Sequence, residues 1–170
     1  MRRKIFNLSV FSLVAVLAGS ALSPLTALAQ EDSTVQTQED STTPAQTPSL
    51  YDRLGGVYSI ATVVDDFVER LLVNDVLNAN PKIDAARDHV PKAGLKFRVT
   101  ALICQLAGGP EVYHGRSMTD AHAHLGITEK EWDAMVADFV LSLNKFNVPE
   151  KEQGELFALV GPTKDQIVTK

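Results

Sequence analysis

Cysteine is nearly absent from this chain of 170 residues, which contains Cys104 alone. A single cysteine excludes an intramolecular disulfide, so the apolar core has to hold the fold together. Cys104 falls on the apolar face of a predicted helix, where a buried, unreactive thiol is the expected state. The chain also lacks the lipobox cysteine that marks an exported lipoprotein.

Basic residues are in the minority, at 16 against 21 acidic ones, and the net charge is −5. This acidic balance argues against nucleic acid or an anionic lipid surface as a partner. The Ser-His-Asp, Cys-His, P-loop and Rossmann glycine patterns of several common enzyme classes are missing as well. No stretch shows convincing strand alternation, so the sequence predicts an all-α fold.

The first 29 residues have the three parts of a secretory signal. Residues 2–4 are basic, residues 5–22 form an apolar run, and Ala27-Leu28-Ala29 is a small-residue cleavage site. These features predict a signal peptide that is removed after Ala29, which leaves the mature protein periplasmic or secreted and free of the membrane. An uncleaved membrane anchor is the alternative.

Residues 30–49 contain almost nothing apolar and are rich in Gln, Thr, Ser, Glu, Asp and Pro. Such a segment cannot bury enough surface to offset the entropy lost on ordering, so we predict a disordered polar linker. The folded domain is then expected to occupy residues 50–170.

Apolar residues at spacings of three and four divide this domain into helices. Thr128 and Glu131 have the spacing of a capping box, and Gly161-Pro162 is a helix stop. The predicted helices cover residues 60–72, 95–106, 132–143 and about 150–160, with short turns at 51–54 and 83–89 and a frayed last turn around Ile167.

Residues 108–127, GGPEVYHGRSMTDAHAHLGI, carry the chemistry of interest. Ser117 is placed to cap a short helix that ends near Gly126, and His122 lies on its apolar face with Met118. A histidine there is costly unless its ring nitrogens are satisfied, either by hydrogen bonds within a core or by a metal. His124 points elsewhere, because residues two apart do not share a helix face, so the pair is not a chelating set.

Several motifs resemble those of group 1 truncated haemoglobins, in the same order and at similar spacing. They are LYDRLGG at 50–56, VVDDF at 63–67, LK at 95–96, GGPEVYHGRSM at 108–118 and the AHAHLGI that follows. The resemblance covers residues 50–165 and implies a truncated globin-like two-over-two helical sandwich, here in an exported form. It also implies that His122 is the proximal ligand of the iron in haem b.

By the same resemblance, apolar side chains surround the haem and cations near its rim pair with the propionates. The cofactor-binding candidates are the apolar residues Phe67, Val68, Leu95, Val99, Leu102, Met118 and Phe139, the cations Lys96, Arg98 and Arg116, and Tyr113 of the Tyr-x-Gly-Arg-x-Met element. Ordinary core packing remains an alternative or additional role for the apolar residues. Solvated surface charge remains the alternative for the cations.

Three features depart from the family's pattern. Val68 stands where the family usually has a tyrosine, and Leu95 and Val99 are apolar near a position that often carries glutamine. Both changes remove hydrogen-bond donors, so we predict weak, fast-dissociating oxygen binding, with carbon monoxide and nitric oxide less affected. Asn80-Pro81 replaces a haem-clamping phenylalanine, and the longer segment after it contains His89, an alternative sixth ligand.

The function that follows is reversible binding of a diatomic gas, O2, NO or CO, with an unidentified reductase to reduce the iron. Nitric oxide dioxygenation and a peroxidase-like reaction stay open as side activities, although the apolar distal side does not favour the first. The alternative from another class is a haem-free, globin-like helical module that binds a different partner. A simple metal site formed by His114, His122 and His124 is the third hypothesis.

Overall fold

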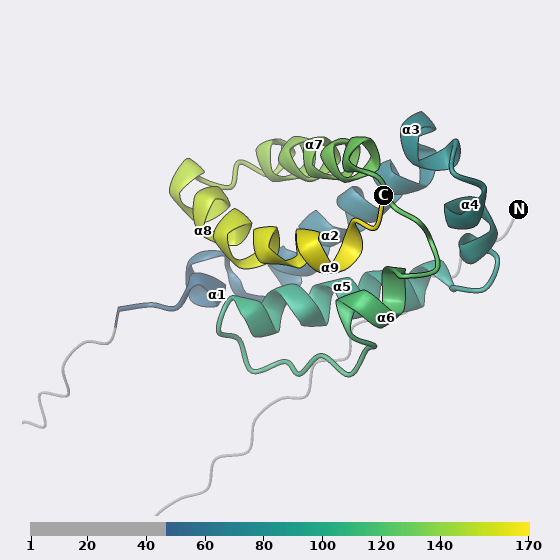
Figure 1. Cartoon of the computed structure of the whole chain (residues 1–170). Coiled ribbons are helices and arrows are strands. Elements are labelled where there is room, and N and C mark those ends of the chain that lie inside the picture. Colours follow the sequence, from purple (N-terminus) through teal and green to yellow (C-terminus); the bar gives the residue numbers. More distant parts are fainter. Residues whose placement is uncertain (1–46) are drawn as a thin grey trace, which may run out of the picture. The chain divides into compact units, whose positions relative to one another are not determined.

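A computed structural model describes residues 47–170 (Figure 1), so the predicted signal peptide and most of the predicted linker lie outside the described residues. The described part contains helices and turns and no β-strand, which confirms the all-α prediction. The elements are α1 (Leu50–Arg53), α2 (Gly56–Val73), α3 (Asp75–Asn78), α4 (Pro81–Arg87), α5 (Lys92–Leu106), α6 (Met118–His122), α7 (Glu129–Lys145), α8 (Glu150–Val160), η1 (Gly161–Thr163) and α9 (Lys164–Ile167). None of the helices in residues 47–170 combines the length and the apolar composition that a membrane span requires.

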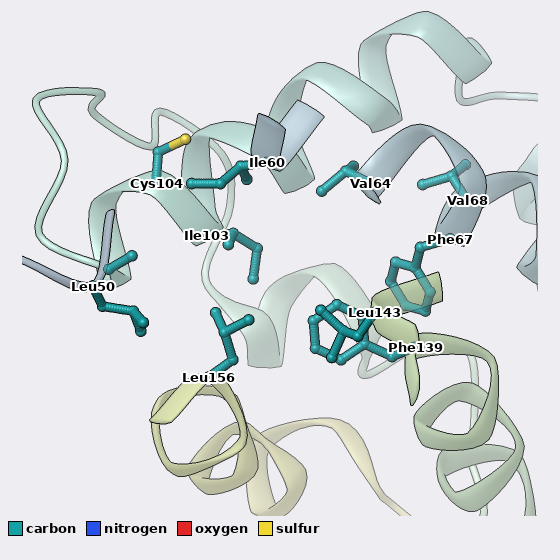
Figure 2. Close-up of a cluster of buried hydrophobic side chains, with 11 residues drawn as sticks. Leu50, Ile60, Val64, Phe67, Val68, Ile103, Cys104, Phe139, Leu143 and Leu156 are labelled. Atoms are coloured by element: carbon teal, nitrogen blue, oxygen red, sulfur yellow. The ribbon is translucent and has the colours of Figure 1, made fainter. Parts of the chain in front are cut away.

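Helix α2 provides much of the core. Its apolar residues follow the predicted period, and Ile60, Val64, Phe67 and Val68 are buried. This face packs against α5 and α7. Figure 2 shows the side chains of these helices meeting in one cluster, together with Leu156 of α8. Because burying one such side chain stabilises a fold by roughly 1.5–3 kcal/mol, this cluster is the main source of the domain's stability.

Helix α7 begins at the predicted capping box. Thr128 Oγ1 accepts a hydrogen bond from Glu131 N (3.3 Å), and Glu131 Oε2 accepts one from Thr128 N (2.7 Å). The helix then places Phe139 between two other rings, with centroid distances of 5.0 Å to Phe67 of α2 and 5.5 Å to Phe157 of α8. Tilted aromatic pairs at these distances are favourable, so Phe139 joins three helices.

A polar contact connects α2 to α7 beside this core. Asp66 of α2 accepts hydrogen bonds from Ser142 Oγ (2.9 Å) and Arg70 Nε (2.8 Å), and it pairs with Lys145. The bond with Lys145 is the largest influence that lowers the pKa of Asp66, to about 2, against an opposing effect of burial. The carboxylate therefore remains ionised in the folded protein.

The segment between α2 and α5 is more helical than the sequence predicted. Asn74 caps α3, a helix that was not predicted, and Asn80 caps α4, which begins with a proline. Arg87 at the end of α4 donates hydrogen bonds to Leu71 O (2.9 Å) and Leu72 O (3.3 Å). These carbonyls belong to the last turn of α2, so Arg87 caps α2 and anchors the long connection to it.

The chain does not end in the predicted frayed turn. After α9, Val168 forms a parallel bridge with Ile127, and Thr169 N donates to Ile127 O at 2.9 Å. This is the only β-type pairing in residues 47–170. It attaches the end of the chain to the link between α6 and α7.

Candidate functional site

His122 is the last residue of α6, a helix of five residues. Ser117 caps the helix, because Ser117 Oγ accepts a hydrogen bond from Asp120 N at 3.0 Å. His122 Nδ1 lies 2.8 Å from Met118 O, one turn earlier. A carbonyl oxygen only accepts, so Nδ1 carries the proton and Nε2 keeps its lone pair.

The environment of His122 favours the neutral ring. The side chain is half-buried, whereas His124 is exposed, as the spacing predicted. Burial lowers the pKa of His122; the bond to Met118 O opposes this change, and the charges of His124 and Arg116 add to it. A neutral imidazole is the form that binds a metal, so His122 is both hydrogen-bonded and able to act as a ligand through Nε2.

The segment before α6, residues 108–117, is fixed to the end of α5 and to α1. Tyr51 OH donates a hydrogen bond to Glu111 Oε1 (3.1 Å), and Tyr51 N donates to Ala107 O (2.9 Å). A Cβ atom on Gly109 would lie 2.4 Å from the ring of Tyr51. Glycine is therefore required at this position by the close approach of the tyrosine ring.

Tyr113 holds the same segment further along. Its backbone N donates to Gln105 Oε1 (2.7 Å), and its OH donates to Arg116 O (2.9 Å). Tyr113 therefore fixes the backbone of the segment that leads into α6. Its predicted role as a residue that binds the cofactor stays a prediction.

The predicted apolar pocket residues fall into two groups. Phe67, Val68 and Phe139 are buried in the main cluster, and Leu95 and Val99 pack against it from α5. Outside this cluster, two further candidates are half-buried; they are Leu102 and Met118. The structure thus brings Phe67, Val68, Leu95, Val99 and Phe139 together, and they contribute to the core whether or not they also line a pocket.

The predicted cations differ in their surroundings. Lys96 is largely buried and its ammonium group pairs with Asp65 and Glu69 of α2, which raise its pKa. Arg98 and Arg116 are exposed. The observed role of Lys96 is therefore to tie α5 to α2, and a role in binding propionate would compete with these ion pairs. Arg98 and Arg116 remain candidates for the rim.

A model of the bacterial-like globin family matches residues 49–169. The chain belongs to this family. The globin is 31% identical over 117 residues to the group 1 truncated hemoglobin GlbN of Synechocystis sp., which covers 66% of this chain and 90% of that protein. It is 26% identical over 125 residues to the group 1 truncated hemoglobin GlbN of Mycolicibacterium paratuberculosis, and this match covers 74% of this chain and 88% of that protein.

Solved structures share the globin's fold. The truncated hemoglobin from Tetrahymena pyriformis, in its Fe(III) form, matches with a TM-score of 0.61 and 21% identity over 72% of this chain and 100% of that chain. The 2/2 hemoglobin from Synechococcus sp., in the cyanomet state with covalently attached heme, matches with a TM-score of 0.61, 26% identity and the same coverage. These likenesses confirm the two-over-two helical fold.

Globins hold haem iron through a proximal histidine, so this globin is a haem protein that binds diatomic gases. The residues present fit that group: one imidazole keeps a free Nε2, and apolar side chains of α2, α5 and α7 meet in one cluster. Neither the family match nor the relatives support the haem-free alternative.

The other histidines of the globin do not gather around His122. His89, His114 and His124 are exposed, and residues 47–170 contain no group of three or more His, Cys, Asp or Glu residues that could hold a metal ion. The hypothesis of a simple metal site at His114, His122 and His124 is therefore wrong. Ligation of the iron by His89 stays a prediction.

A cavity of about 350 Å³ lies among α2, α5, α7 and α8 of the globin. Its lining includes Val64, Ile103 and Phe139, and it does not include His122. Phe139 is the one predicted site residue that borders it. The cavity therefore lies within the main apolar cluster, and its lining does not extend to His122.

Sequence reasoning missed the residues that hold α6 at its C-terminal side. Asn80 Nδ2 donates to Leu125 O (3.2 Å), and Ile127 binds Thr169. The capping role of Asn80 could be predicted, because asparagine before proline is typical of a helix start. Its bond to Leu125 O could not, because Leu125 lies 45 residues away in the sequence. The backbone bond between Thr169 and Ile127 could not be predicted, because an isolated β-bridge produces no periodic pattern in the sequence.

Proposed function

We propose that this globin is exported and that His122 Nε2 binds the iron of one haem b. The observation that carries the proposal is the 2.8 Å hydrogen bond from His122 Nδ1 to Met118 O. Such a bond fixes the tautomer, orients the ring and makes Nε2 a stronger ligand. When bound, haem supplies an iron atom at which a diatomic gas binds reversibly.

The apolar residues of α2 and α5 then determine which gas is held. Val68 is fully buried, and Leu95 and Val99 pack against the same cluster. None of these side chains has a hydrogen-bond donor. Oxygen depends on such donors more than carbon monoxide does, so we expect oxygen to dissociate quickly. The same side chains exclude water from the pocket.

The rim of the site has two exposed arginines, Arg98 and Arg116. Guanidinium groups form strong paired hydrogen bonds with carboxylates, so these residues are suited to the haem propionates. Tyr113 supports one of them, because its OH binds Arg116 O. Lys96 has less freedom to take part because of its pairing with Asp65 and Glu69.

The export proposal is supported by the basic, apolar and small-residue segments of residues 1–29. A protein outside the cytoplasm needs an electron donor there to keep its iron reduced, so an unidentified reductase is part of the proposal. N-terminal sequencing of the protein from the periplasm or medium is expected to begin at Gln30. A mature protein that begins at Met1 would show that the signal is not cleaved.

Haem titration tests the central claim. Haemin added to the purified protein should give a sharp Soret band that saturates at one haem per chain. His122→Ala should lose or broaden this band, whereas His124→Ala is the matched control and should keep it, because His124 is exposed. A protein that folds and takes up no haem, or a His122→Ala variant with an unchanged band, would overturn the assignment.

A further inference from the structure

Helix α6 is too short to maintain its own conformation. It has five residues, none of them buried, and isolated helices of this length are unstable in water. Beyond the helix, the chain turns, and Leu125 N donates a hydrogen bond to His122 O at 2.8 Å. The orientation of His122 therefore depends on what holds the link at residues 125–127.

The C-terminal residues hold this link directly. Ile127 is 9% exposed and pairs with Val168, and Ile127 O accepts hydrogen bonds from Thr169 N (2.9 Å) and Lys170 N (3.3 Å). Helix α9, which precedes these residues, also contacts α6. In Figure 1, the chain end marked C meets the segment that joins α6 to α7.

The α4 side holds the link as well. Asn80 Nδ2 donates to Leu125 O at 3.2 Å. Gly126, at φ +63°, is enclosed: an added Cβ would lie 3.2 Å from Lys170 Cε and 3.6 Å from Lys82 Nζ. The link is thus restrained from two directions, by the start of α4 and by the end of the chain.

We propose that residues 168–170, here called the C-terminal clasp, are positioning residues for His122. The inference rests on the proposed function, because it concerns how His122 is presented to haem. The clasp limits the movement of residues 125–127. Because Leu125 N donates a hydrogen bond to His122 O, this also limits the movement of the His122 backbone and therefore the orientation of its ring. Without the clasp, α6 shifts more freely, His122 Nε2 samples more orientations, and haem is held for a shorter time.

A pair of variants at Thr169 isolates the hydrogen bond. Both variants lose the Thr169 hydroxyl. Thr169→Pro also removes the backbone N–H that donates to Ile127 O, whereas Thr169→Ala keeps this N–H. Thr169 is exposed, so neither substitution disturbs the core. A chain that ends at Ile167 removes the whole clasp and shows the largest expected effect.

Amide hydrogen exchange in the purified protein is the first readout and does not require haem. Thr169→Pro and the shortened chain should exchange about tenfold faster in residues 118–127, while residues 132–143 of α7 keep the parent rate. Thr169→Ala should match the parent in both regions. Unchanged exchange in residues 118–127, or equal acceleration in α7, would overturn the proposal.

The second readout reports on the histidine itself. In the haem-loaded, reduced protein, the iron–histidine stretching band should shift or broaden in Thr169→Pro and stay unchanged in Thr169→Ala. Haem transfer to apomyoglobin should be several-fold faster in the proline variant. A clasp that only stabilises the domain would leave the band unchanged. If the parent takes up no haem, the proposed function fails, while the exchange data still decide whether the clasp restrains α6.

Discussion

Replacing Asp66 with asparagine should weaken the connection between α2 and α7. The Asp66 carboxylate accepts hydrogen bonds from Ser142 and Arg70 and pairs with Lys145. Asparagine preserves the size of the side chain and one acceptor, but it removes the charge. Arg70 and Lys145 then lose their ionic partner in the folded protein.

The lowered pKa of Asp66 gives the size of the effect. It is about 2 in the folded protein against an ordinary value of 3.8. At ~1.4 kcal/mol per pKa unit, the full shift corresponds to an upper limit of about 2.5 kcal/mol. Because the side chains of Arg70 and Lys145 are 31% and 53% exposed, solvent screens both pairs, and we expect a loss of about 1–2 kcal/mol.

The sign of the pH dependence follows from the direction of the shift. A pKa lowered on folding contributes stability that is fully present above the ordinary value of 3.8 and is lost as the pH falls through about 2. The difference between the parent and Asp66→Asn should therefore be about half as large at pH 3 as at pH 7.

Urea unfolding at pH 7 and pH 3 measures this difference. Asp65→Asn is the matched control, because its side chain is 64% exposed and such an ion pair contributes less than about 1 kcal/mol. A loss for Asp66→Asn that is equal at the two pH values, or no greater than that of the control, would refute the reasoning.

Three further changes test other parts of the structure. Val68→Tyr should slow oxygen dissociation about tenfold or more by adding a donor to the distal side, with Val68→Phe unchanged, as measured by stopped-flow displacement with carbon monoxide. Gly126→Ala should lower the free energy of unfolding by about 1 kcal/mol in thermal or urea unfolding, because φ is +63° there. Burial, with the charge of Glu111, raises the pKa of the Cys104 thiol to about 11, so a thiol reagent at pH 8 should modify it only in denaturant. The first expectation fails if Val68→Tyr releases oxygen as fast as Val68→Phe. The second fails if Gly126→Ala leaves the unfolding midpoint unaltered, and the third fails if the reagent modifies native Cys104 rapidly.

The long helices could be predicted because their signals are local. The stripe that includes Ile60 and Val64 has the helical period, and the side chains of Thr128 and Glu131 satisfy backbone groups three residues away. The placement of His122 on a capped helix was predictable for the same reason. These features depend on neighbours within one or two turns, so a sequence contains all the information that they require.

Features that depend on distant partners could not be predicted in this way. Lys96 stays a predicted residue of the haem rim, but its ion pairs with Asp65 and Glu69 of α2 depend on partners 31 and 27 residues away and have no local signal. The end of the chain looked frayed because residues 164–170 have little apolar periodicity. Its order comes from the pairing with Ile127, which belongs to another part of the sequence.

The hydrogen bond between Thr169 and Ile127 also sets an order of events during synthesis. Residues 168–170 are made after the helices of the core and after α6. By then the residues of α2, α5 and α7 have been available to pack for longer, since chains fold from the N-terminus as they emerge. Helix α6 is therefore held in its final position only after the core has begun to pack, so the proposed haem site is completed late in folding.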